Sequence, residues 1–519
     1  MLPQWLALAL ALLLPVFGAA AVAWAGRGGR AVAGKHRATR EACTAVASIA
    51  TFLCVAWIAV EVAAGERPRL EIGEVFPGLP IAFEVEPLGL LFALVASALW
   101  PVTSMYAVGY LRAHRSRHQT RFFSFFALSI AAALGIAFSA NLLTLFLFYE
   151  ALTLATYPLV THQRTGDARR AGRLYLGILM GTSIFLLLPA ILATYQIAGS
   201  LDFVPGGLLQ GKIEGSAAAF LFALFAFGIG KAALMPVHRW LPAAMVAPTP
   251  VSALLHAVAV VKAGVFCVLK VTIYVFGLPL LQSTQASSWI GWVATFTLLA
   301  TALVALTQDD LKARLAYSTI SQLSYIVLGA CLATAAGVLG GAMHIAMHAL
   351  GKITLFFCAG AIYVAHHKRS IASMDGLGRR MPWTYLAFFI ASLSIIGLPP
   401  TGGSWSKWLL VLGTVEGERW LWGLALLLSS LLSIGYLMPV VVRGLLRPEP
   451  GQPEGEDNLA GEGTWLAPPE ERAEAPVLVL APALLTAAGT LLLFFFASDL
   501  YGLLEPLVQT VAPAAGGSP

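Results

Sequence analysis

Charged residues are scarce in this chain. Asp, Glu, Lys and Arg make up 11% of its 519 residues, hydrophobic residues make up 58%, and the mean hydropathy is +0.80. An ordinary soluble domain has about 25% charged residues. No polar stretch is long enough to form a soluble domain that could hold a nucleotide or a redox cofactor. This composition excludes a soluble globular protein and predicts a polytopic, all-α membrane protein.

Cysteine is also sparse and unpatterned. The five cysteines are scattered, mostly within apolar runs, and none forms a CxxC pair: Cys43, Cys54, Cys267, Cys331 and Cys358. This spacing argues against iron–sulfur, zinc and disulfide frameworks. We therefore expect no cofactor and no metal, and no catalytic chemistry in this chain. Any energy-supplying reaction would take place on other subunits.

Apolar runs of about 20 residues, the length that crosses a bilayer, recur from end to end. We predict fourteen transmembrane helices, at 4–25, 42–65, 87–110, 121–139, 141–161, 172–197, 215–236, 249–276, 288–306, 313–331, 336–365, 383–412, 418–442 and 475–497. The first run resembles a secretory signal, but it lacks a basic start and is followed by basic residues. We interpret it as a retained helix.

Basic residues gather in alternate loops, which explains the net charge of +6 by the positive-inside rule and not by nucleic-acid binding. With the N-terminus outside, the inner loops carry Arg27, Arg30, Lys35, Arg37 and Arg40; Arg112, Arg115, Arg117 and Arg121; Arg164, Arg169, Arg170 and Arg173; Arg239; Lys312 and Arg314; Lys368, Arg369, Arg379 and Arg380; Arg443, Arg447 and Arg472. The other loops hold Arg67, Arg69, Lys212 and Arg419. The bias predicts both termini on the outer side of a bacterial-type cytoplasmic (inner) membrane.

Two predicted spans are interrupted. The seventh breaks at Pro236, and the twelfth breaks at Pro399 and Pro400. Backbone groups freed by a break must be buried in protein or line a wet cavity. Breaks five spans apart predict two five-helix repeats of inverted topology, spans 4–8 and 9–13, with sites at discontinuous helices 7 and 12. The alternative is that Pro and Gly are simply commoner in membrane helices.

The resulting organisation has five parts. We predict a three-helix segment at 1–120, the first repeat at 121–276, the second at 288–442, a flexible cytoplasmic loop at 443–474, and a C-terminal helix and tail at 475–519. The loop is rich in Pro, Gly and Glu, which is typical of a linker and not of a domain.

Four lysines interrupt apolar runs: Lys231, Lys262, Lys352 and Lys407. A charge at the bilayer centre costs about 2.5–3.5 kcal/mol on insertion scales. Lysine changes its protonation state readily when desolvated, so these residues are candidate proton carriers. Lys270 also lies in a span, but near its outer end, where we expect its stem to snorkel.

One carboxylate and three histidines extend this set. Glu150 is expected to pair with Lys231, with a static structural ion pair as the alternative. His256 precedes Lys262 by six residues, or roughly 9 Å along a helix, which suits stations joined by water. His256 could equally be a hydrogen-bonded packing residue.

His344, His348 and Lys352 recur at intervals of four and share one helix face. HxxxH could ligate a metal or haem, but the third ligand is missing and the lysine would repel a cation. A purely structural role is the other alternative, and a proton relay is favoured. Tyr317, Ser318, Ser321 and Gln322 could support Lys352 or only join helices.

The segments HRWLPAAMVAPTPVSALLHAVAVVKAG, DLKARLAYSTISQLSY and HIAMHALGKITLFF resemble the signatures of antiporter-like subunits. These occur in respiratory complex I (NADH:quinone oxidoreductase), Mrp cation/proton antiporters and membrane-bound hydrogenases. The resemblance implies a fourteen-helix core with inverted repeats. It matches Glu150, Lys231, His256, the His344, His348 and Lys352 trio, and Lys407 to the family's relay positions. Lys262 in VKAG is more similar to the Mrp and hydrogenase branch.

The sequence thus predicts a proton-translocating subunit that works with other membrane subunits. The alternatives are an Mrp-type Na⁺/H⁺ antiporter subunit and a membrane scaffold without transport.

Overall fold

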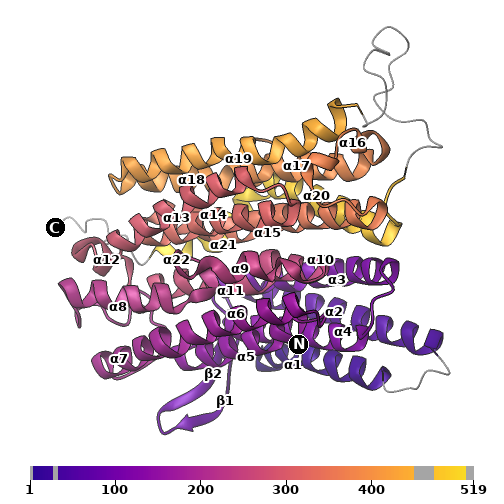
Figure 1. Ribbon diagram of the computed structural model, residues 1–519. Helices are drawn as coiled ribbons and strands as arrows, with labels where there is room; N and C mark the ends of the chain where they lie inside the picture. The colour runs from indigo at the N-terminus through magenta and orange to yellow at the C-terminus, as the bar shows by residue number, and fades with distance from the viewer. Residues whose placement is uncertain (1–3, 27–32, 449–472, 510–519) are drawn as a thin grey trace.

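The chain folds into a bundle of long, roughly aligned helices (Figure 1). The computed structural model describes residues 4–26, 33–448 and 473–509, apart from the side chains of 33–36 and 256. The predicted loop at 443–474 therefore lies mostly outside the described residues.

The first part contains three helices and one hairpin. The helices are α1 (Gln4–Ala25), α2 (Ala33–Ala63) and α3 (Pro87–Ala113). α1 packs against α2 and α4. Lys35, Arg37 and Arg40 lie within α2 and not in a loop, so the predicted start of the second helix at 42 was too late.

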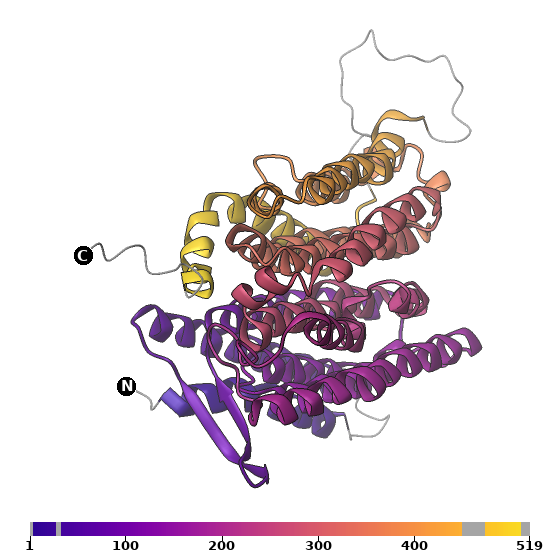
Figure 2. The same cartoon turned by 90° about the vertical axis from the view of Figure 1, so that its left-hand side faces the viewer.

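An antiparallel pair, β1 (Arg69–Phe76) and β2 (Leu79–Glu84), departs from the all-α prediction. Its register joins Arg69 to Glu84 and Phe76 to Leu79 across a turn at Pro77 and Gly78. β-Branched and aromatic residues flank this Pro–Gly turn, which is a hairpin pattern. Figure 2 views the bundle from the end where this hairpin lies.

The next part runs to residue 284. Its elements are α4 (Gln119–Ala137), α5 (Leu142–Val160), α6 (Gly166–Thr182), the π-helix η2 (Ser183–Leu187), α7 (Leu188–Ala198), α8 (Gly215–Gly228), η3 (Gly230–Ala232), η4 (Val237–Arg239), α9 (Trp240–Ala243), η5 (Ala244–Val246), α10 (Thr249–Ala253), η6 (Leu254–Val258), α11 (Val260–Lys270), η7 (Val271–Phe276) and α12 (Leu278–Thr284). Many of these are short because GIGKAALMP and VAPTP combine Gly and Pro, which end helices.

The remaining elements are longer. They are α13 (Ser288–Thr307), α14 (Leu311–Leu332), α15 (Ala335–His366), η8 (Ile371–Ser373), α16 (Leu377–Arg380), α17 (Pro382–Ile396), α18 (Gly403–Glu416), α19 (Trp420–Leu446), α20 (Val477–Phe495), α21 (Ala497–Leu504) and α22 (Pro506–Gln509).

Eleven helices of the described chain are long and apolar enough to cross a membrane. A twelfth is added if the bent pair Val260–Phe276 and Leu278–Thr284, which meet at 83°, is one span. Two shorter apolar helices, α8 and α17, fall below that length. The fold is therefore that of a polytopic helical membrane protein.

α15 is the centre of the bundle. It packs against α3, α14, α17, α18 and α20, and it also contacts α10 and α11. In Figure 1 it lies between the orange helices of the C-terminal half and the purple helices of the N-terminal half. The middle of α15 is therefore enclosed by other helices, and His344, His348 and Lys352 are buried there.

Candidate functional site

All four lysines that interrupt apolar runs are buried inside the protein. Lys231, Lys262 and Lys352 are 0% exposed and Lys407 is 7% exposed. None of them reaches water by snorkelling, so each ammonium group depends on ligands from the protein.

Lys231 lies on η3, in the irregular segment that follows α8. Its Nζ donates to the carbonyl of Tyr149 at 2.9 Å and to Oγ1 of Thr153 at 2.6 Å. The same nitrogen lies 3.1 Å from the centroid of the Tyr149 ring, a cation–π contact. Lys231 is thus held by α5, the helix that also carries Glu150.

Glu150 does not form the direct ion pair expected with Lys231. Both of its carboxylate oxygens are buried and lack a hydrogen-bond partner in the described chain. The carboxylate nevertheless lies close enough to act on the Lys231 charge through space. Tyr149 and Thr153 take the direct contacts instead, so the two charges are neighbours without being locked together.

Lys262 on α11 meets His348 on α15. The Lys262 Nζ lies 2.6 Å from Nδ1 of His348. An ammonium and a doubly protonated imidazole have only donors to offer each other, so one of the two groups must supply a lone pair. Only one proton can therefore lie between the two nitrogen atoms, although either side chain can carry it.

His344 continues this arrangement one helical turn away. The rings of His344 and His348 stack with centroids 5.6 Å apart, as their spacing of four predicts. His344 binds Oγ of Ser406 through Nδ1 at 2.8 Å and Oε1 of Gln322 through Nε2 at 3.2 Å. It also stacks on Tyr325 at 5.6 Å.

Lys407 on α18 is held by the broken end of α17. α17 ends at Ile396, since Gly397 adopts φ +94° and the Pro399–Pro400 pair follows. The Lys407 Nζ donates to the carbonyls of Ile395 at 2.8 Å and Ile396 at 3.2 Å. Carbonyls of a last helical turn have no intrahelical partner, and a helix C-terminus favours cations.

Lys407 is also linked to the histidines. Its Nζ donates to Oγ of Ser430 at 3.0 Å, and Ser430 contacts the Tyr325 hydroxyl at 3.1 Å. The Tyr325 ring lies 4.6 Å from Nζ and stacks on His344. Lys262, His348, His344 and Lys407 therefore form one connected set of buried groups.

Lys352 takes a different direction from the histidines. Its Nζ donates to Oγ of Ser318 at 2.6 Å and to the carbonyl of Leu315 at 3.3 Å. Ser318 in turn donates to the Tyr436 hydroxyl at 2.9 Å. Of the predicted polar stretch on this helix, Ser318 supports Lys352 directly. This branch points toward the start of α14, away from Lys407.

His256 lies on η6, and its side chain is outside the described residues. Its place in the set remains a prediction. Pro236 precedes η4 directly after the Lys231 segment.

A family model described as "NADH:quinone oxidoreductase/Mrp antiporter, TM" matches residues 139–433, which include every residue of this set. The chain belongs to this family. Subunit N of NADH-quinone oxidoreductase from Desulforudis audaxviator is 33% identical over 440 residues, covering 83% of this chain and 85% of that protein. Chain 5 of NAD(P)H-quinone oxidoreductase from Synechocystis is 33% identical over 347 residues, covering 63% of this chain. This chain spans about half the length of that second relative.

Two solved structures share the fold of this antiporter-family chain over almost its whole length. A chain of the Mrp complex from Dietzia sp. superposes with a TM-score of 0.79 at 22% identity. A chain of the membrane-bound sulfane sulfur reductase, an archaeal respiratory membrane complex, gives 0.81 at 23% identity. Each match covers 98% of both chains.

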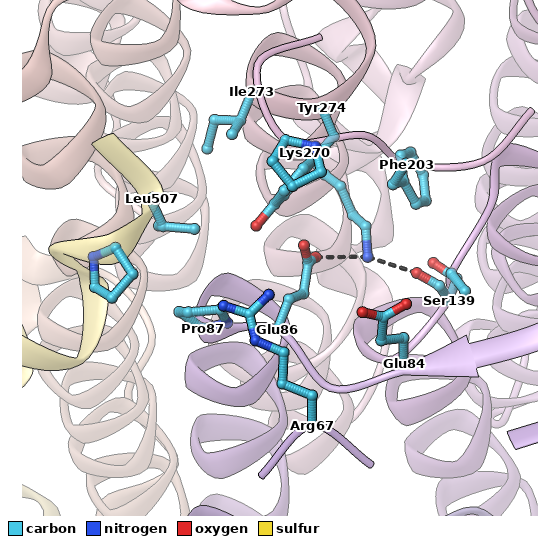
Figure 3. Close-up of a pocket in the computed structure, with 13 residues that line it drawn as sticks. Arg67, Glu84, Glu86, Pro87, Ser139, Phe203, Lys270, Ile273, Tyr274 and Leu507 are labelled. Atoms are coloured by element: carbon cyan, nitrogen blue, oxygen red, sulfur yellow. Dashed lines mark hydrogen bonds and ion pairs between the residues drawn. The ribbon is translucent and has the colours of Figure 1, made fainter. Parts of the chain in front are cut away.

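Lys270 was misplaced by the sequence analysis. It does not snorkel, since it is only 1% exposed and its Nζ lies 2.6 Å from Oε1 of Glu86 and 2.6 Å from the carbonyl of Ser139 (Figure 3). A cavity of about 160 Å³, which Glu84 and Arg67 also line, adjoins this pair. The ammonium group contacts a carboxylate and a carbonyl and joins α11 to the start of α3, which indicates a structural role.

Sequence reasoning also missed the neutral groups that hold the lysines. Thr153, Ser406 and Ser430 each bind a buried lysine or histidine, yet serine and threonine are common in membrane helices and gave no distinct signal. No group of three or more His, Cys, Asp or Glu side chains in the described part of the antiporter-family chain could hold a metal ion.

Gly264 on α11 fixes the position of Lys231. A Cβ atom at Gly264 would lie 2.3 Å from the carbonyl carbon of Lys231, which is backbone and cannot rotate away. We expect Gly264→Val to lower the thermal midpoint of the purified protein clearly, since overpacking costs about 1–3 kcal/mol. Gly181→Val is the control, because nothing lies within 4 Å of a Cβ there. Equal midpoints for the two variants would contradict the close approach.

The Lys270–Glu86 pair allows a double-mutant test. Lys270→Met should destabilise the protein by about 3–5 kcal/mol by leaving a buried charge unpaired. Adding Glu86→Leu should recover a large part of that loss in denaturation measured in mixed micelles. Lys212→Met, at an exposed lysine, is the control. If both single variants lost the same free energy of unfolding, the Lys270 side chain would be snorkelling and not buried.

Proposed function

We propose that the chain is a proton-translocating, antiporter-like subunit of a multi-subunit membrane complex. The single observation that carries this proposal is the Lys262–His348 contact at 2.6 Å, continued by His344 toward Lys407. Static packing does not require two titratable groups to face each other at the centre of a bundle. A relay does, because a proton must pass between groups that can each hold it.

The proposal includes a membrane frame. Fourteen crossing segments are reached if α8 with η3 forms a discontinuous helix 7 and α17 with α18 forms a discontinuous helix 12. In this frame we retain the two inverted repeats and the five segments predicted from the sequence. Lys231 and Lys407 then occupy equivalent breaks, and this is the arrangement in which repeat-built transporters place their sites.

Orientation follows from the charges at the two ends of the bundle. Arg117, Arg164 and Arg369 line one cavity, so these basic segments share one end. A second cavity, lined by Glu84, Glu86 and Leu507, lies at the opposite end of α3. α3 is 27 residues long, or about 40 Å. We assign the basic end to the cytoplasm and the termini to the outer side of the inner membrane.

In the first repeat, Lys231 is the proton carrier and Glu150 sets its charge. Glu150 lies on α5 together with Tyr149 and Thr153, which bind Lys231, so a displacement of α5 changes both the field at Lys231 and its hydrogen bonds. A partner subunit that moved this helix could thereby drive Lys231 to release its proton. The next stations are His256 and Lys262.

In the second repeat, the proton reaches His348 from Lys262 and passes to His344. From there it leaves outward past Lys407 through Tyr325 and Ser430. The branch from Lys352 through Ser318 and Tyr436 runs toward the basic end of the bundle, so it provides this repeat with its own connection to the cytoplasm. Repulsion between neighbouring lysines couples the steps, because two adjacent charges cannot both be retained.

Alanine substitutions test the relay. We expect Lys231→Ala and Lys352→Ala to reduce proton transport by the reconstituted complex to background while assembly is preserved. Lys212→Ala, at an exposed lysine, should transport normally. Wild-type transport by both buried-lysine variants would overturn the relay and favour the scaffold interpretation.

An Mrp-type Na⁺/H⁺ antiporter subunit is the second candidate. The observation in its favour is the pair of buried, unpartnered Glu150 oxygens, since carboxylates are hard ligands that suit such cations. Transport measured with and without sodium, and with a protonophore, separates the two. A proton gradient should form in sodium-free buffer and collapse when the protonophore is added. A strict requirement for sodium would select the antiporter instead.

A further inference from the structure

A cavity of about 420 Å³ opens at the basic end of the bundle. Its walls come from the segment after α3, the segment after α5, residues 247–248 before α10, the start of α14 and the end of α15. The cavity thus lies where the N-terminal segment and both repeats meet.

The cations of this cavity have no acidic counterpart. Arg117, Arg164, Lys312 and Arg369 line it, and no Asp or Glu does so in the described chain. The guanidinium groups of Arg117, Arg164 and Arg369 have no carboxylate within 4.0 Å among the described residues.

Other arginines at the same end of the bundle do have acidic partners. Arg112 pairs with Glu41, and Arg443 contacts Asp375 at 2.8 Å. Carboxylates are therefore present at this end of the bundle, but among the described residues none of them lines the cavity.

Two histidines add unused polar atoms. Nδ1 of His162 and Nε2 of His114 are buried without a hydrogen-bond partner in the described chain, and His162 is 6% exposed. Burial, and next the charge of Arg121, lower the pKa of His162 to about 4. Arg164 is the main cause that lowers the pKa of His118 at the rim. The charges of Arg121 and Arg164 therefore add to the burial that disfavours a second proton on His162, and Arg164 acts in the same direction on His118.

We propose that this cavity binds a phosphate-bearing anion, and that in the membrane the headgroup of an anionic phospholipid supplies it. Guanidinium forks match phosphate oxygens in geometry and charge. Basic pockets between membrane helices on the cytoplasmic side are suited to such headgroups. The bound phosphate would join segments of both repeats, which makes it a structural ligand at the seam. This proposal does not depend on proton transfer along the buried lysines.

The test compares two triple variants of the full-length chain, purified with the subunits that remain bound to it. The cavity variant is Arg117→Gln, Arg164→Gln and Arg369→Gln. The control variant is Arg169→Gln, Arg170→Gln and Arg173→Gln, which removes the same charge from exposed positions on α6 that do not line the cavity. Thermal stabilisation is titrated with dioctanoyl phosphatidylglycerol, dioctanoyl phosphatidylcholine and inorganic phosphate.

We expect phosphatidylglycerol to stabilise the wild-type and control proteins, with at least tenfold weaker apparent affinity in the cavity variant and no effect of phosphatidylcholine. Inorganic phosphate acting as well would support recognition of the phosphate group itself. Stabilisation by inorganic phosphate alone would overturn the lipid as the source. Equal responses of the two triple variants, or no response of the wild type, would overturn the site. If the triple variant does not fold, Arg164→Gln against Arg170→Gln makes the same comparison.

Discussion

The structure depends on one constraint: an ammonium group buried among apolar helices needs oxygen or nitrogen ligands that lipid cannot provide. Lys231, Lys270, Lys352 and Lys407 each bind a backbone carbonyl. The carbonyls of Ser139 and Ile395 lie at the ends of α4 and α17, whereas those of Tyr149 and Leu315 lie within α5 and α14 and accept through a second lone pair. Helix ends and helix interiors therefore both supply ligands to the buried charges of this bundle.

Lys262 differs from the other buried lysines. Its ligand is the His348 imidazole, a group that can itself accept a proton, while Lys231, Lys352 and Lys407 are held by carbonyls and hydroxyls that cannot at neutral pH. The junction between α11 and α15 is thus chemically distinct from the lysine sites on either side of it. It also joins the two halves of the chain at two deeply buried helices.

Much of this could be predicted from the sequence. The apolar runs, the four buried lysines and the stacking of His344 on His348 follow from composition and from the helical repeat. The hairpin at 69–84 was missed, because hydropathy alone reports only what crosses the membrane. The ligands of Lys407 could not be foreseen, since every residue has a backbone carbonyl and the sequence does not show which ones are free to bind. Lys270 was misjudged because its partner, Glu86, is remote in the chain.

The cradle that α17 offers to Lys407 has an evolutionary consequence. Its acceptors belong to the main chain of Ile395 and Ile396, so replacing either isoleucine by another apolar residue leaves them in place. Selection can preserve the site by preserving the bend that Gly397 and the two prolines impose. Distant chains can thus exchange most of their side chains and still hold a lysine at this point, in keeping with a shared fold at 22% identity.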